Sequence, residues 1–129
     1  MRRLTRHQVL LIHDELLTQT GGASGVRDEG MLQAALAAPY AGMEREEFYP
    51  TVTGKAARLA FALVNDHPFV DGNKRIGVTA MAVLLSINGY ALVATDDDLI
   101  EFGLGLAMGE IDAVEAEAWV VRHAVPGDL

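Results

Sequence analysis

The 129-residue sequence contains no cysteine, which excludes disulfide bonds and metal sites built from thiolates. Aromatic residues make up only 6% of the chain, whereas alanine and leucine are abundant, and this balance favours helices over strands. No apolar run approaches the roughly 20 residues that a membrane-spanning helix needs. The basic amino terminus, MRRLTRHQ, precedes no apolar signal core, so we expect a cytoplasmic protein without a membrane segment.

Positive charge is also scarce in this sequence. The chain has 10 lysines and arginines against 18 aspartates and glutamates, which gives a net charge of −8. Proteins that bind nucleic acid directly usually present a basic face, but the basic residues here are scattered apart from Arg2, Arg3 and Arg6. We therefore expect no direct binding of nucleic acid. Half of the residues are hydrophobic, and a chain of this length can bury a core, so residues 1–129 are predicted to form a single domain.

Apolar residues recur at helical spacing along most of the chain. Thr5 followed by Gln8 has the pattern of a capping box, and Thr53 is expected to cap a central helix. We expect helices over residues 5–20, 28–38, 53–66, 76–88, 97–108 and 112–124. Residues 39–53 have weak periodicity and are expected to form a loop, and residues 90–94 are expected to be extended. The predicted fold is all-α, a compact bundle of six or seven helices with no regular sheet.

The stretch 67–75 reads HPFVDGNKR and lies between two apolar segments of helical length. Pro68 disfavours helical geometry at His67, so the preceding helix should end there. Gly72 permits a sharp turn and close approach of the backbone to a ligand. The next helix should begin near residues 73–75, and its first N–H groups can hold an anion such as a phosphate. The pattern therefore predicts a ligand-binding loop between two central helices.

Five side chains of this stretch form the candidate site. Lys74 and Arg75 oppose the dipole of the helix that they begin, and a bound polyphosphate would offset that conflict. Asp71 suits Mg²⁺, which usually binds one or two carboxylates together with substrate phosphates. Asn73 can hydrogen-bond a phosphate oxygen or orient the loop, and His67 is the candidate general base. These groups together indicate phosphoryl transfer; the alternative is a capped helix connection without chemistry.

The stretch resembles the signature of the Fic/Doc family, in which a His-x-Phe-x-acid-Gly/Ala-Asn motif joins two central helices. Lys74 is similar to the lysine that follows this motif in the Doc (death-on-curing) toxin branch. The branch that transfers AMP has glycine there and a second arginine at the position of Val78. The segments IHDELL, GGASGVRDEG, SINGY and MGEI also resemble Doc segments in order and spacing. The resemblance therefore covers nearly the whole chain.

This resemblance implies an enzyme that transfers the γ-phosphate of ATP, with Mg²⁺, to a serine or threonine hydroxyl of a protein. The expected protein substrate is translation elongation factor Tu, and the expected outcome is arrest of protein synthesis. His67 would act as the base and Asp71 would hold the metal, while Asn73, Lys74 and Arg75 bind the nucleotide phosphates beside the turn at Gly72. A Phd-like antitoxin would block the site with its carboxyl-terminal segment. Residues 39–53 would correspond to a flap beside the active site.

Two other functions stay open, namely transfer of AMP to a protein hydroxyl and a catalytically silent interaction module. Outside the stretch, His13 lies beside an apolar helical stripe and is predicted to be buried and hydrogen-bonded, without a catalytic role. Phe69 is predicted to face the core. Gly54-Lys55 does not form a P-loop, because the spacing and the residue after the lysine do not fit. The glycine-rich residues 21–27 are predicted to be a simple connection.

Overall fold

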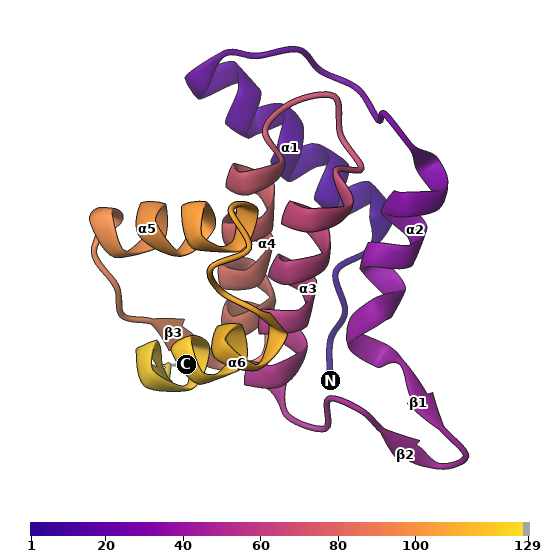
Figure 1. The fold of residues 1–129 in the computed structure, drawn as a ribbon, viewed down its shortest axis with the longest axis vertical. Helices are drawn as coiled ribbons and strands as arrows, with labels where there is room; N and C mark the ends of the chain where they lie inside the picture. Colours follow the sequence, from indigo (N-terminus) through magenta and orange to yellow (C-terminus); the bar gives the residue numbers. More distant parts are fainter. Residues whose placement is uncertain (128–129) are drawn as a thin grey trace.

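Helices account for most of the computed structural model, which describes residues 1–127 (Figure 1). Within that range it has six α-helices, one short 3-10 helix and two pairs of short strands. In chain order these are α1 (Arg6–Thr20), α2 (Glu29–Ala37), η1 (Ala38–Tyr40), β1 (Gly42–Met43), β2 (Glu46–Glu47), α3 (Val52–Asp66), α4 (Asn73–Ile87), β3 (Tyr90–Leu92), α5 (Asp96–Ala107), α6 (Ala113–His123) and β4 (Ala124–Pro126). The prediction of a bundle of six or seven helices is confirmed.

The helices α3 and α4 form the centre of the bundle (Figure 1). The helices α1 and α5 pack against α4, whereas α2 and α6 pack against α3. Leucines 59 and 63 of α3 and leucines 84 and 85 of α4 are almost wholly buried. A Cβ atom at Gly77 would lie 2.6 Å from Val64 Cγ2 and 3.2 Å from the Ala60 carbonyl oxygen. The absence of a side chain there lets the two central helices approach closely.

Side-chain caps set where several helices begin. Thr5 and Gln8 form the predicted capping box at α1. The N-cap of the central helix α3 lies two residues earlier than predicted, at Thr51 and not at Thr53. Thr51 has extended backbone and its hydroxyl accepts a hydrogen bond from Gly54 N at 3.0 Å. Both threonines fit the pattern of a cap, and the one that follows Pro50 takes the role.

The fold is mostly helical and has no regular sheet, as predicted, but it also contains two short antiparallel ribbons. One pairs β1 with β2, and the other pairs β3 with β4. Residues 90–94 were expected to be extended, and the structure supplies their partner: Leu92 lies opposite Ala124 and Tyr90 opposite Pro126. This pairing joins segments far apart in the sequence, which local periodicity does not report.

The β1–β2 hairpin occupies part of the segment that was expected to be a loop. It projects from the start of α3, at the opposite end of that helix from the loop that joins α3 to α4 (Figure 1). The implied placement of a flap beside the site is therefore wrong for this structure. Lys55 explains where the hairpin lies: its side chain is buried, and its Nζ donates to the Glu47 carboxylate at 3.0 Å and to the Tyr49 carbonyl oxygen. None of the helices within residues 1–127 has the length and apolar character to cross a bilayer.

Candidate active site

The signature loop, residues 67–72, joins α3 to α4 near the top of Figure 1. Left-handed backbone lies at both of its ends, with φ +48° at His67 and +76° at Gly72. Glycine adopts this conformation freely, but a residue with a Cβ atom bears a cost of about 1–2 kcal/mol. Strain of this kind persists where surrounding contacts hold it, and it clusters at functional sites. The imidazole of His67 is exposed to solvent at the end of α3, as a general base for an external hydroxyl must be.

Asp71 is held through both its carboxylate and its backbone. Its Oδ1 accepts from Gly72 N at 3.0 Å and its Oδ2 from Ala23 N at 3.3 Å. The His13 Nε2 atom lies 2.8 Å from the Asp71 carbonyl oxygen. The carboxylate is exposed and keeps lone pairs for a cation. Within residues 1–127 no group of three or more His, Cys, Asp or Glu side chains could hold a metal alone, so a single carboxylate fits Mg²⁺ that takes its other ligands from phosphates and water.

The amide of Asn73 bonds the signature loop to the start of α4. Its Oδ1 accepts from Phe69 N at 3.0 Å, and its Nδ2 donates to the Phe69 carbonyl oxygen at 3.0 Å. Of the two roles that the sequence left open, this arrangement supports orientation of the loop. Phe69 is 1% exposed, as predicted, and its ring stacks on His13 with centroids 3.8 Å apart. The prediction that His13 is buried and hydrogen-bonded is also confirmed.

Lys74 and Arg75 both lie in the first turn of α4. Lys74 is exposed, whereas Arg75 is half-buried and its Nη1 donates to the Thr20 hydroxyl and to the Gly21 carbonyl oxygen, the latter at 3.4 Å. The first helical hydrogen bond of α4 runs from Ile76 N to the Gly72 carbonyl oxygen at 2.9 Å, so the preceding N–H groups have no partner within the helix. These N–H groups and the two cations are the candidate groups for binding an anion such as a phosphate.

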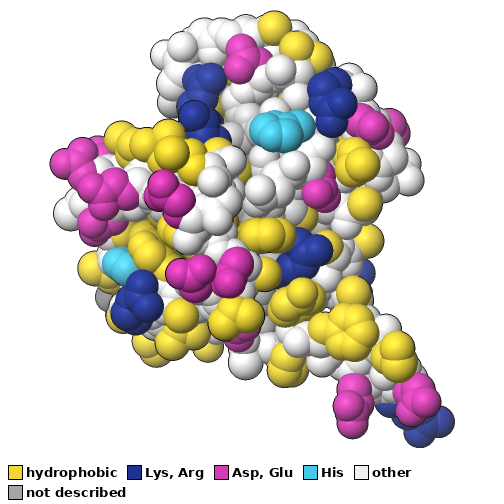
Figure 2. Space-filling view, viewed as in Figure 1, with side chains coloured by type: hydrophobic (Ala, Val, Ile, Leu, Met, Phe, Trp, Pro, Cys, Tyr) yellow, Lys and Arg dark blue, Asp and Glu magenta, His cyan; other side chains and the backbone are white. Residues whose placement is uncertain are grey.

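A groove of about 510 Å³ adjoins this site. Its walls come from α1, α4 and α5, and its lining is mostly apolar, with charged side chains contributed by Lys74 and Arg75 of α4 and by Asp96 of α5. Val78 lies in this lining, so the position of the second arginine in AMP-transferring proteins presents an apolar side chain here. In Figure 2, two separate groups of basic side chains flank a histidine in the upper part of the molecule, where acidic side chains also lie. Further acidic side chains lie over α5 and at the hairpin tip.

Comparison with known proteins agrees with this geometry. The model of the Fic/DOC family matches residues 3–85, which is more than half of the chain and includes the whole signature loop. The chain belongs to the Fic/Doc family.

Two relatives carry Doc names. A protein named Toxin Doc from Mycolicibacterium smegmatis is 44% identical over 77 residues, which are 60% of this chain and 59% of the relative. The match therefore spans about three fifths of that relative's length. A protein named Protein kinase doc from Escherichia phage P1 is 29% identical over 111 residues, which are 86% of each chain.

In this Fic/Doc chain the segment between α1 and α2, residues 21–28, connects the two helices as predicted, and it also braces the signature loop. Arg27 N and Asp28 N donate to the Pro68 carbonyl oxygen at 2.7 and 3.1 Å, and Val70 N donates to the Gly25 carbonyl oxygen at 3.0 Å. These three hydrogen bonds link residues 25–28 of the segment to residues 68–70 of the signature loop. The glycines of the segment were a visible signal of unusual backbone, but they do not say what the segment contacts.

A glycine in the same segment makes room for Asp71. Gly22 has φ +116°, and a Cβ atom there would lie 2.9 Å from Asp71 Oδ2 and 3.1 Å from Leu17 Cδ2. A larger residue would therefore push on the carboxylate of the candidate metal ligand. The glycine is needed both for its backbone conformation and for the close approach of the brace to the site.

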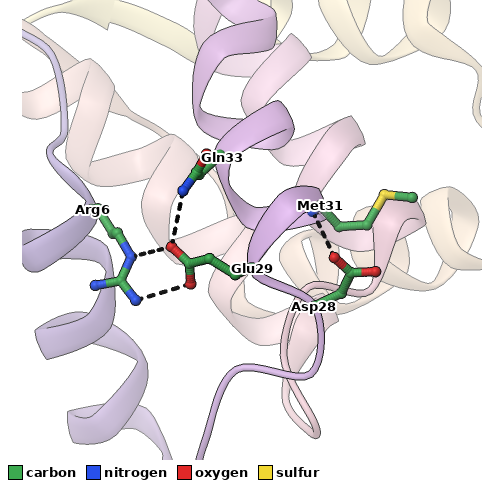
Figure 3. A network of polar contacts seen from close by, with 5 residues as sticks. All are labelled: Arg6, Asp28, Glu29, Met31 and Gln33. Atoms are coloured by element: carbon green, nitrogen blue, oxygen red, sulfur yellow. Dashed lines mark hydrogen bonds and ion pairs between the residues drawn. The ribbon is translucent and has the colours of Figure 1, made fainter.

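An ion pair ties the two helices that flank this brace in the Fic/Doc chain (Figure 3). Arg6 of α1 donates from Nε and Nη2 to the two carboxylate oxygens of Glu29 at 2.6 and 2.9 Å, and Gln33 Nε2 donates to Glu29 Oε1 at 3.4 Å. The hydrogen bond from Arg6 is the main cause that lowers the pKa of the Glu29 carboxyl, and the same bond raises the pKa of Arg6. The pair holds the start of α1 against the start of α2.

Proposed function

We propose that this chain is the toxin of a toxin–antitoxin pair and transfers the γ-phosphate of ATP to a serine or threonine hydroxyl of a protein. One observation carries the proposal: the exposed His67 and Asp71 share one short loop with the anion-binding start of α4. Phosphoryl transfer needs these groups, a base for the hydroxyl, a ligand for the metal and positive charge for the phosphates. The names of the two relatives, Toxin Doc and Protein kinase doc, support the same reading.

Each residue then has a defined part in the reaction. His67 takes the proton from the attacking hydroxyl, the oxygen forms a bond to the γ-phosphorus, and the bond from that phosphorus to the bridging oxygen of ADP breaks. Lys74, Arg75 and the first N–H groups of α4 bind the phosphates and neutralise the charge that develops in the transition state. Asp71 would hold Mg²⁺, which supplies further charge neutralisation when bound. Asn73 keeps the loop in position through Phe69.

The proposal extends to the partners that the Doc resemblance implies. The protein substrate would be elongation factor Tu, so that its phosphorylation arrests translation. The regulator would be a Phd-like antitoxin, and the groove between α1, α4 and α5 supports this part of the proposal. Its apolar lining includes Ile100 and Leu104, which are 59% and 41% exposed, and Lys74 and Arg75 line the same groove. An apolar carboxyl-terminal segment seated there would cover the phosphate-binding cations.

Labelled ATP tests the proposed activity. Purified protein, Mg²⁺ and a bacterial lysate are incubated with ATP that carries the label on either the α- or the γ-phosphate, and His67→Ala serves as the control. We expect a protein band labelled from γ-labelled ATP alone, which the His67→Ala variant does not produce. A band labelled from α-labelled ATP would instead show AMP transfer, and no label with a lysate that contains elongation factor Tu would favour a silent interaction module.

A further inference from the structure

Arg27 bridges two consecutive carbonyl groups at the end of α3. Its Nε donates to the carbonyl oxygen of His67 at 2.6 Å, and its Nη2 donates to the carbonyl oxygen of Asp66 at 3.1 Å. The side chain reaches these atoms from the brace between α1 and α2 and lies at the surface. The backbone N–H of the same residue donates to the Pro68 carbonyl oxygen at 2.7 Å. Arg27 therefore holds the carbonyl groups of three successive residues, of which His67 is the middle one.

The two carbonyl groups bound by the guanidinium lie on either side of the His67 backbone. The peptide plane that contains the Asp66 carbonyl precedes the φ rotation of His67, and the plane that contains the His67 carbonyl follows its ψ rotation. A rigid, planar fork that binds both oxygens restrains these two angles together. The Cα–Cβ direction of His67 follows from the same angles. The fork of Arg27 thus restrains the direction in which the imidazole leaves the backbone.

The chain needs such a restraint because the usual ones are missing at this helix end. Left-handed residues that end helices are usually glycine or asparagine, and N–H groups that follow the helix bond its last carbonyls. Here the left-handed residue is His67, with φ +48° and ψ +55°, and the residue after it is Pro68, which has no N–H. The guanidinium of Arg27 instead donates to the carbonyl oxygens of Asp66 and His67, and its positive charge suits the carboxyl end of a helix.

We propose that Arg27 is a positioning residue for His67, which sets the base in the orientation needed to accept the substrate proton. The inference rests on the proposed function insofar as His67 is the base. Arg27 itself touches backbone atoms of the loop, and the phosphate-binding groups of α4 are separate from it. Its loss should therefore lower the rate of the chemical step and leave nucleotide binding almost unchanged.

Steady-state kinetics with elongation factor Tu as substrate test this separation. Arg27→Met removes the fork and the charge, and Arg27→Lys keeps the charge but cannot span two carbonyl groups with a planar fork. We expect both variants to lower kcat, Arg27→Met by about 100-fold, the loss typical of a misplaced reacting group, with the KM for ATP changed by less than about twofold. The matched control is Arg122→Met, since Arg122 is also an exposed arginine and lies at the carboxyl end of another helix, α6, and it should keep the wild-type kcat.

A second readout does not depend on activity. The backbone carbon chemical shifts of His67 report its φ and ψ angles, and they should move away from left-handed values in Arg27→Met but stay in place in Arg122→Met. Thermal unfolding shows whether each variant is folded at the assay temperature. Unchanged His67 shifts would overturn the inference, as would a wild-type kcat in Arg27→Lys. If the wild-type protein transfers no γ-phosphate, the proposed function fails, whereas the chemical shifts still decide whether Arg27 positions His67.

Discussion

At the scale of single residues, His67 combines an exposed imidazole with a backbone conformation that is unfavourable for its side chain. The φ of +48° would suit glycine, so a histidine stays there at a cost in stability. The cost is consistent with a base that must stand at the end of a helix and face an external substrate. Stability and activity should therefore respond in opposite directions to substitution at this position.

Replacing His67 by glycine or alanine separates the two effects. Both His67→Gly and His67→Ala should abolish phosphate transfer, because each removes the base. His67→Gly should be more stable than His67→Ala by about 1 kcal/mol, since only alanine has the Cβ atom that is disfavoured in left-handed backbone. Urea unfolding of the two variants measures the difference. An alanine variant as stable as the glycine variant would contradict the left-handed conformation.

Lys74 resembles the lysine of the Doc branch, where AMP-transferring proteins have glycine. We therefore expect Lys74 to favour phosphate transfer over AMP transfer. Its side chain is exposed in the first turn of α4, where it can reach a bound phosphate. We expect Lys74→Gly to lower γ-phosphate transfer by about 100-fold, comparable to the loss of one transition-state donor at other active sites, and to raise the share of AMP transfer. Parallel assays with α- and γ-labelled ATP measure both. A variant that kept the full rate of phosphate transfer would show that Lys74 is not the determinant.

At the scale of elements, features that depend on neighbouring residues were predicted from the sequence. Features that depend on contacts between residues far apart in the sequence were not. The cap of α1 was predicted because Thr5 and Gln8 lie three residues apart and bond each other. The ends of the signature loop were also predicted, since Pro68 and Gly72 act on their immediate neighbours. The left-handed backbone of His67 was not predicted, because it depends on hydrogen bonds from the Arg27 side chain to the Asp66 and His67 carbonyl oxygens. No local pattern reports a partner that lies 40 residues away.

The same limit explains the other missed elements. The β3–β4 ribbon and the brace along the signature loop both depend on pairing between segments far apart in the sequence. The place of the β1–β2 hairpin depends on the buried Lys55, whose Nζ bonds both Glu47 and the Tyr49 carbonyl oxygen. Composition and spacing identified the loop that carries the candidate chemistry, while the contacts that hold this loop come from the tertiary fold.

The ion pair between α1 and α2 gives a pH dependence at this scale. The hydrogen bond from Arg6 lowers the pKa of Glu29 in the folded chain. The ion pair therefore contributes its full stabilisation above the ordinary pKa of the carboxyl group, near 4.5. This stabilisation is lost as the pH falls through the lowered pKa of the folded chain. Glu29→Gln should therefore be less stable than the wild type at neutral pH, and the two should converge in acid.

Urea unfolding at a series of pH values between neutral and acid measures this difference. The control is Glu110→Gln, since Glu110 is exposed and makes no side-chain hydrogen bond or ion pair within residues 1–127; it should give little difference at any pH. A gap between wild type and Glu29→Gln that stayed constant down to acid pH would contradict the assignment to the charged carboxylate. Loss of the Arg6–Glu29 ion pair should also weaken the contacts between the α1–α2 segment and the signature loop. The segment runs from the end of α1 to the start of α2, and the ion pair joins these two helices.

At the scale of the whole molecule, three helices create the groove that Lys74 and Arg75 help to line. Neither α1, α4 nor α5 alone contains it, and its apolar lining is open to solvent. A net charge of −8 disfavours direct binding of DNA, so the DNA-binding part of a toxin–antitoxin pair would belong to the antitoxin. The groove and the charge distribution together suit a protein that is controlled by a bound partner segment.

A charge placed in the groove tests this control. Leu104→Glu should weaken binding of a Phd-type antitoxin that neutralises the wild-type protein, by about tenfold or more in Kd, because the new carboxylate would be desolvated against an apolar segment. Val114→Glu is the matched control, since Val114 is 78% exposed on α6 and does not line the groove. Calorimetric titration measures both, and equal affinities for the two variants would place the antitoxin elsewhere.

The identity of the transferred group decides most directly whether the signature loop is a phosphotransferase site. Purified elongation factor Tu is incubated with the wild-type protein, ATP and Mg²⁺, and its intact mass is measured beside a reaction with His67→Ala. We predict a mass increase of one phosphate group with the wild-type protein and no increase with the variant. An increase of one AMP unit would contradict phosphate transfer, and an equal gain of phosphate with His67→Ala would contradict the role of His67 as the base.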